Sequence, residues 1–384
     1  MSGPALLLLL LACALLACDD AEPPRSPVRQ TVESLGRELF VPLTADFARD
    51  AQQLERALSQ LCRARDAGAL DEARDAWSTA AARFKLTEVI AFGPHTLSPW
   101  RLGAKIDFWP AREDKILEAL RARGGEPSLP ASAGDAGAAV PAGRDAGAVR
   151  AGELGAAARG LPVIEYLLYA GGEDAVLAQL VDVAAASARC AYLRELGADL
   201  VADARELDGA WRGSFARDLS LQDGPNEHFA TVREGFARIV NSLAFVVEDV
   251  RTRRLAKPLG GSRATAHPEV VESRFSARSI RDALDALQGV ENVFTGRYGQ
   301  RQALGLGALL RARGRPLDRQ LAHRLESARA ALRAIPEPLD RAVMEDRARV
   351  QDAITALDEL LVFLQVDLNQ ALAVTATFGA GDGD

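Results

Sequence analysis

Aromatic and β-branched residues are scarce in this chain of 384 residues. Phe, Trp and Tyr together make up 5% of it, whereas Ala, Leu and Arg are abundant. No stretch alternates apolar and polar side chains over the length of a strand. Because Ala, Leu and Arg favour helices while strands favour β-branched and aromatic residues, the sequence predicts an all-α protein.

The usual catalytic motifs are also missing. The four His residues form no HExxH pair, and there is no GxSxG elbow, P-loop or dinucleotide-binding fingerprint. His95 and His267 lie in two Pro-containing loops and are the histidines best placed to reach a cleft. The net charge of -7 argues against nucleic acid as a partner.

The apolar run Ala5–Ala17 has the length of the core of a secretion signal and is too short for a permanent membrane span. It ends in Leu-Leu-Ala-Cys, which resembles the lipobox of bacterial lipoproteins. We therefore expect a signal peptide at 1–17, lipidation of Cys18 and a polar tether over 18–30, with ordinary secretion as the alternative. The protein would be lipid-anchored to a membrane of the cell envelope and face the periplasm. Asp19 favours the inner membrane under the enteric sorting rule, but the sequence leaves both membranes open.

Two cysteines, Cys62 and Cys190, remain in the mature chain, both in predicted helices and in an oxidising compartment. We predict a disulfide between them, with two separate buried thiols as the alternative. The bond would close a loop of about 130 residues and contribute about 4–5 kcal/mol in the chain-entropy model.

The chain divides into two predicted helical halves, 31–213 and 214–384. Residues 124–152 interrupt the first half with a Gly/Ala/Pro-rich stretch that has no aromatic residue. Such a composition cannot bury enough apolar area to offset its ordering entropy, so we expect a disordered surface insertion there.

Four carboxylates stand out by their surroundings: Glu88, Asp107, Glu165 and Glu272. Glu165 lies within GLPVIEYLLY (160–169), which is otherwise apolar. A buried carboxylate must be paired, hydrogen-bonded or metal-bound, because desolvating it alone costs several kcal/mol or shifts its pKa. The plain alternatives are an ion pair with one of the many Arg residues for Glu165, and simple helix capping for Ser276. Taken together, carboxylates beside Gly/Pro turns and tryptophans in both halves predict a polar pocket between two bundles.

Several of these segments, in this order, resemble the imelysin family of bacterial envelope proteins, also called imelysin-like or iron-regulated lipoproteins. The resemblance covers about 35–376 apart from the insertion, and it extends to the tail after Phe378. Its anchors are Trp77 through Phe92-Gly93-Pro94, Trp109-Pro110, GLPVIEYLLY, Pro258-Leu259-Gly260 through Glu272-Ser273-Arg274-Phe275-Ser276, and the closing Phe378 to Asp384.

The resemblance implies two bundle-like halves with a site between them and a role in iron uptake or regulation. It also implies a GxHxxE motif, proposed to bind metal, which aligns here with Gly160 to Glu165. The motif His is Pro162 in this chain. Because proline supplies no ligand, the substitution removes a nitrogen donor suited to zinc or iron and makes a peptidase role doubtful.

We therefore expect a non-catalytic envelope lipoprotein that binds a small ligand or metal between the halves. If Glu165 binds a metal together with Glu88 or Asp107, hard oxygen donors favour calcium or ferric iron. The alternatives are a metallopeptidase in which His95 or His267 replaces the missing ligand, and a helical scaffold that docks envelope protein partners. The predicted site residues are Glu88, Gly93, Pro94, Asp107, Trp109, Gly160, Glu165, Glu272, Ser273 and Ser276.

Overall fold

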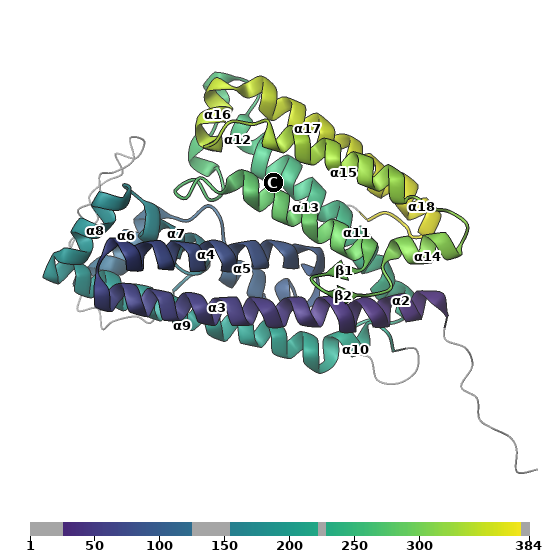
Figure 1. Cartoon of the computed structure of the whole chain (residues 1–384), viewed down its shortest axis with the longest axis horizontal. Helices are drawn as coiled ribbons and strands as arrows, with labels where there is room; N and C mark the ends of the chain where they lie inside the picture. Colours follow the sequence, from purple (N-terminus) through teal and green to yellow (C-terminus); the bar gives the residue numbers. More distant parts are fainter. Residues whose placement is uncertain (1–25, 125–153, 222–227, 378–384) are drawn as a thin grey trace, which may run out of the picture.

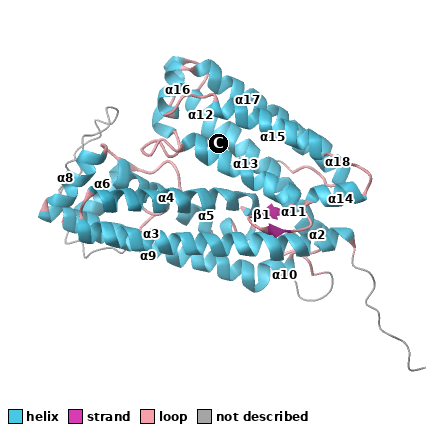
Figure 2. Ribbon diagram, in the orientation of Figure 1, coloured by secondary structure: helices cyan, strands magenta, loops and turns pink. Residues whose placement is uncertain are grey.

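Helices make up most of the structure, a computed structural model that describes residues 26–124, 154–221 and 228–377. Figure 2 shows helices throughout these residues and one small patch of strand. The strands β1 (Arg297–Tyr298) and β2 (Arg301–Gln302) pair antiparallel, with Tyr298 opposite Arg301. The predicted all-α class is confirmed, with one short hairpin that the sequence did not indicate.

The first half of the chain forms a layer of long helices, in the lower part of Figure 1. These are α3 (Val41–Ala64), α4 (Ala67–Thr87) and α9 (Val183–Ala210), and α3 packs along both of the others. The shorter helices of this layer are α2 (Pro27–Leu35), α5 (Leu102–Ile106), α6 (Glu113–Arg121), α7 (Leu161–Tyr169), α8 (Glu173–Val181) and α10 (Ala216–Asp218).

A second layer, in the upper part of Figure 1, comes from the second half of the chain. Its long helices are α11 (Val232–Asp249), α13 (Ser279–Thr295), α15 (Asp318–Arg333) and α17 (Arg347–Val362). The shorter ones are α12 (Lys257–Leu259), α14 (Leu306–Ala312), α16 (Leu339–Glu345) and α18 (Asn369–Leu372). Because α13 packs against α4, the two layers meet along these two helices.

The sequence of α3 and α4 explains both their packing and their ends. Leu43, Phe47 and Leu54 of α3 recur at a helical spacing and are at most 1% exposed, which places them on the face that packs against the other helices. At the start of α4 the Asp66 side chain accepts a hydrogen bond from the Ala69 backbone N–H at 2.8 Å, a standard N-cap.

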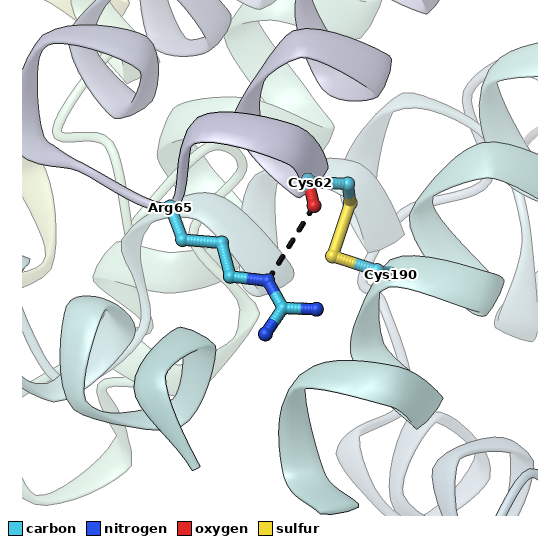
Figure 3. The surroundings of a disulfide bond; sticks show 3 residues. All are labelled: Cys62, Arg65 and Cys190. Carbon is cyan, nitrogen blue, oxygen red and sulfur yellow. Dashed lines mark hydrogen bonds between the residues drawn. A yellow bond between two sulfur atoms is a disulfide. The ribbon is translucent and has the colours of Figure 1, made fainter. Parts of the chain in front are cut away.

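A disulfide joins Cys62 of α3 to Cys190 of α9, which are 128 residues apart in sequence (Figure 3). Their Cα atoms lie 5.5 Å apart, and both residues are buried. The Arg65 guanidinium donates a hydrogen bond to the Cys62 carbonyl beside this bond. The disulfide therefore holds two long helices of the first layer together.

The predicted tether ends earlier than residue 30, because α2 begins at Pro27. Ser26 explains this start: its side chain accepts a hydrogen bond from the Arg29 backbone N–H, and Pro27 fits the first helical position. The predicted signal peptide and Cys18 lie outside the described residues, and so does the predicted insertion except for Gly124.

Within the described ranges, no single helix is long and apolar enough to cross a membrane. One bent pair of segments, Glu173–Val181 and Ala186–Asp218, passes the test of length and composition when taken together. Most of the second segment belongs to α9, which packs along α3.

Candidate functional site

A small pocket lies where α7 and the segment after α5 meet the loop before α13. Trp109, Pro110 and Ala111 line it from the segment after α5, and Pro162 and Glu165 from α7. The loop contributes Glu269, Val271, Ser273, Arg274 and Phe275. The pocket is therefore formed by residues from both halves of the chain.

The start of α7 is fixed by Gly160. Its φ of +81° favours glycine, and a Cβ at this position would lie 2.4 Å from the Ile106 carbonyl oxygen. Pro162 follows in the first turn, where a missing N–H costs nothing. The Trp77 indole N–H donates a hydrogen bond to the Leu161 carbonyl at 2.9 Å and ties this start to α4. The Gly-Leu-Pro sequence thus positions α7, and its Pro162 also lines the pocket.

Glu165 is buried and hydrogen-bonded to the other half of the chain. Its side chain is 3% exposed, and Oε1 accepts hydrogen bonds from the Ser276 backbone N–H and from Ser276 Oγ, both at 2.8 Å. Burial raises the pKa of Glu165 to about 8, and the charges of Asp282 and Glu272 add to the rise, although both Ser276 bonds oppose it. The carboxyl therefore holds its proton at neutral pH.

The loop that carries Ser276 has an unusual backbone. Ser273 and Ala277 adopt φ values of +48° and +56°, which residues other than glycine rarely do. The Ser273 hydroxyl donates to the buried carboxylate of Asp282 at 2.5 Å. Ser276 does not cap the next helix, because α13 begins at Ser279 with Arg278 before it. Ser276 instead supplies both donors to Glu165, so the capping alternative is wrong.

Three of the predicted carboxylates converge on one buried ammonium. The Lys85 Nζ of α4 lies 2.5 Å from Asp107, 2.6 Å from Glu272 and 3.3 Å from Glu88. A second buried cation, Arg254, lies 2.5 Å from Glu88 and 3.1 Å from Glu272. This cluster links α4 to the helix that follows α11 and to the loop before α13.

The cluster shifts the pKa values of its members. Burial lowers the pKa of Lys85, but the charges of Asp107 and Glu272 outweigh it and raise the pKa above its ordinary value. Burial opposes ionisation of Glu272, yet Arg254 and Lys85 hold its pKa near about 2. Both Lys85 and Glu272 therefore stay charged at neutral pH, and the cluster is an ion-pair network.

The ten predicted site residues thus separate into groups. Trp109, Glu165 and Ser273 line the pocket, and Ser276 lies directly behind Glu165. Glu88, Asp107 and Glu272 belong to the ion-pair cluster. Gly160 sets the start of α7.

Gly93 and Pro94 line neither the pocket nor the cluster. Gly93 has a φ of +71°, and a Cβ there would lie 2.1 Å from the Phe215 ring, so this glycine allows a close approach of the ring. Pro94 is buried in the same short turn, Gly93–His95. The role of this turn is therefore in packing.

The two buried cations, Lys85 and Arg254, were not among the predicted site residues. Lys85 lies four residues after Ala81 and eight after Trp77, on the buried stripe of α4, and it is 2% exposed. A lysine on an apolar stripe was the available signal. Arg254 is buried in the π-helical turn Val250–Ala256 and has no comparable signal, because the chain contains many arginines.

The described residues do not fit a metal ion. No group of three or more His, Cys, Asp or Glu side chains among them is arranged to hold one. His95 is buried with its Nε2 3.1 Å from the Thr87 hydroxyl, and burial lowers its pKa to about 4. His267 is exposed, and its Nδ1 lies 3.0 Å from the carboxylate of Glu269, which lines the pocket. Neither histidine therefore forms a metal site with Glu165 in this arrangement.

Comparison with known proteins agrees with the resemblance. The imelysin family model matches residues 41–364, and the chain belongs to this family. A protein named iron-regulated protein A, from Synechococcus elongatus, is 26% identical over 343 residues, covering 86% of this chain and 84% of that protein.

Two solved structures share the fold. An iron-regulated protein A precursor from Parabacteroides distasonis has a TM-score of 0.71 and 18% identity, covering 92% of this chain and 97% of that one. An imelysin-like protein from Psychrobacter arcticum has a TM-score of 0.64 and 17% identity, covering 91% and 97%.

Proposed function

We propose that this protein is a non-catalytic binding protein of the bacterial cell envelope with a role in iron uptake, and that its ligand occupies the pocket beside Glu165. The observation that carries the proposal is a buried carboxyl that lines a pocket formed by both halves and that has no cation as a partner among the described residues. Such convergence of a few polar groups on a concave site is the usual character of a ligand site. The link to iron is supported by the names of the relatives.

A peptidase role has less support. Pro162 occupies the position of the His in the family's GxHxxE motif. The predicted site carboxylate Glu272 is paired with Lys85 and Arg254, so it is poorly placed to hold the metal that would activate a water.

The experiment is complementation of a deletion strain under iron limitation, with cell-associated iron measured by elemental analysis. We expect wild-type protein to restore iron content and Glu165→Ala not to, while Glu118→Ala, an exposed carboxyl on α6, restores it fully. Circular dichroism of each purified variant checks that it is folded. Full complementation by folded Glu165→Ala would reject the pocket and favour a scaffold, and metal-dependent proteolysis by the wild type would favour a peptidase.

We also propose that the protein is held at the envelope membrane through a lipid on Cys18. The support is the apolar run Ala5–Ala17 followed by Leu-Leu-Ala-Cys. Cys18→Ser is expected to move the protein from the membrane to the soluble fraction in cell fractionation. Retention of Cys18→Ser in the membrane fraction would contradict the lipid anchor.

A further inference from the structure

The turn between α14 and α15 carries a concentration of positive charge. Residues 297–320 contain six arginines and one acid, Asp318, whereas the whole chain has a net charge of -7. Four of these arginines lie at the turn itself and on the helix ends beside it, and all four are exposed: Arg311, Arg313, Arg315 and Arg319. We call this region the arginine turn. A local excess of this kind attracts a polyanionic partner even when the protein as a whole is acidic.

Most of this charge is not compensated by acidic side chains of the described residues. Arg311 pairs with Asp318, and Arg313 donates a hydrogen bond to a backbone carbonyl of α18 at 3.1 Å. Within the described ranges, Arg315 and Arg319 form no ion pair. The Arg315 backbone N–H donates to a carbonyl of α14 at 2.9 Å, which fixes the backbone of the turn. The Arg315 and Arg319 side chains are therefore open to a partner outside the chain.

The arginine turn lies at the end of the molecule where the described chain begins. α14 packs against α2, and Figure 1 shows both helices at the same end. Just before α14, the Leu304 backbone N–H donates to Ser34 Oγ of α2 at 2.8 Å. Cys18, the expected lipid acceptor, precedes Ser26 by eight residues, and a chain of that length spans at most about 30 Å. A lipid on Cys18 would therefore keep this end of the protein near the bilayer surface.

We propose that the arginine turn is a second, electrostatic contact with the membrane, at which it binds the phosphate headgroups of anionic lipids. This inference rests on the proposed lipid anchor, because the anchor brings the turn close to the bilayer. Each guanidinium offers a planar fork of N–H donors that matches the oxygens of a phosphate. Several basic side chains near an anionic surface add their attractions, so the turn would hold the protein with its α2 end toward the membrane.

The test measures how the purified full chain carrying Cys18→Ser partitions onto vesicles, so that no lipid on the protein contributes. One set of vesicles is pure phosphatidylcholine, and the other contains about 30% phosphatidylglycerol. Residues 1–17 have no charged side chain, and residues 18–25 hold three acids and one arginine, so neither segment favours the anionic vesicles. We expect at least about tenfold tighter binding to the anionic vesicles in ~0.1 M salt. The preference should disappear in ~0.5 M salt, because salt screens exposed charges.

Two pairs of substitutions separate the arginine turn from the net charge of the protein. Arg315→Glu combined with Arg319→Glu is expected to remove the preference for anionic vesicles. The matched control, Arg63→Glu combined with Arg121→Glu, changes the net charge equally where α3 and α6 end, opposite α2 (Figure 1), and is expected to keep the preference. All four side chains are exposed, and circular dichroism checks that both variants are folded.

Equal partition of the Cys18→Ser protein onto both kinds of vesicle would overturn this inference. A preference that survives the substitutions of Arg315 and Arg319, or that both pairs remove equally, would overturn it as well. Tighter binding to a DNA oligonucleotide than to anionic vesicles would assign the turn to nucleic acid instead. The lipid anchor is decided separately, by fractionation of cells expressing Cys18→Ser after a wash in ~0.5 M salt, which releases electrostatic contacts.

Discussion

The Glu165 side chain shows how one buried acid can link the two halves of a chain. Its carboxyl is out of water and is held by both donors of Ser276 from a loop 111 residues later. Because burial dominates, the pKa of Glu165 is raised to about 8, well above that of an exposed glutamate. The protonation state of Glu165 therefore affects the hydrogen bonds that the pocket can offer to a ligand. It also affects how the stability of the folded protein depends on pH.

The first prediction concerns the pH dependence of stability. An unfolded Glu165 loses its proton near pH 4.5, whereas the folded one keeps it until about pH 8, so raising the pH through this window favours unfolding. Glu165→Gln removes this penalty. Its unfolding free energy relative to wild type should rise between pH 4.5 and 9 by on the order of 4 kcal/mol, at about 1.4 kcal/mol per pKa unit.

Urea unfolding at pH 5, 7 and 9 measures this difference. The matched control is Glu118→Gln, whose side chain is 66% exposed and should change the unfolding free energy by less than about 1 kcal/mol at each pH. A difference for Glu165→Gln that does not increase with pH would contradict the buried, protonated state.

At the scale of the element, α7 depends on its first residue. Gly160→Ala would combine an unfavourable positive φ with a Cβ 2.4 Å from a backbone oxygen. We expect a loss of at least about 2 kcal/mol in unfolding free energy, as for other strained backbone positions. The control is Gly155→Ala, five residues earlier, where φ is -62° and no atom lies within 4 Å of the added Cβ.

Chemical denaturation at neutral pH measures both glycine variants. Gly155→Ala should be neutral or slightly stabilising, by up to about 1 kcal/mol. Equal effects of the two substitutions would show that the backbone of Gly160 is not under the constraint described above.

The all-α class was the easiest part of the fold to predict from the sequence, because Ala, Leu and Arg favour helices. Apolar residues at helical spacing, such as Leu43, Phe47 and Leu54, identify α3 because they must share one buried face. The hairpin of β1 and β2 was missed because two residues per strand give no alternating pattern. The start of α2 was misplaced because Ser26 and Pro27 resemble a linker as much as a helix start.

Many residues of the site could be predicted from the sequence, but their arrangement in space could not. The apolar surroundings of Glu165 indicated burial, yet the sequence could not reveal its partner Ser276 or distinguish the pocket from the nearby ion-pair cluster. Lys85 and Glu272 are 187 residues apart, and no local pattern connects them. Such contacts depend on how the two layers pack.

At the scale of the whole molecule, the Lys85 cluster joins the layers. Lys85→Met would leave Asp107, Glu272 and Glu88 with Arg254 as their remaining buried cation. Removing one partner of a buried ion pair costs about 3–5 kcal/mol, because the other charge stays buried. We expect a loss of this size in unfolding free energy at pH 7.

The control is Lys115→Met on α6, where the lysine is 49% exposed and pairs with Glu118. Its effect should stay below about 1 kcal/mol, as for other surface pairs. If urea unfolding gave similar losses for both lysines, the cluster would not be a main connection between the layers.

The bond between Cys62 and Cys190 has a consequence for chain cleavage. These cysteines lie on either side of residues 125–153, so a protease that cuts once in this segment separates the polypeptide but not the molecule. A nicked sample should migrate as one species on a gel without reductant and as two fragments after reduction. A cut in that segment would leave α3 and α9 covalently joined through the disulfide.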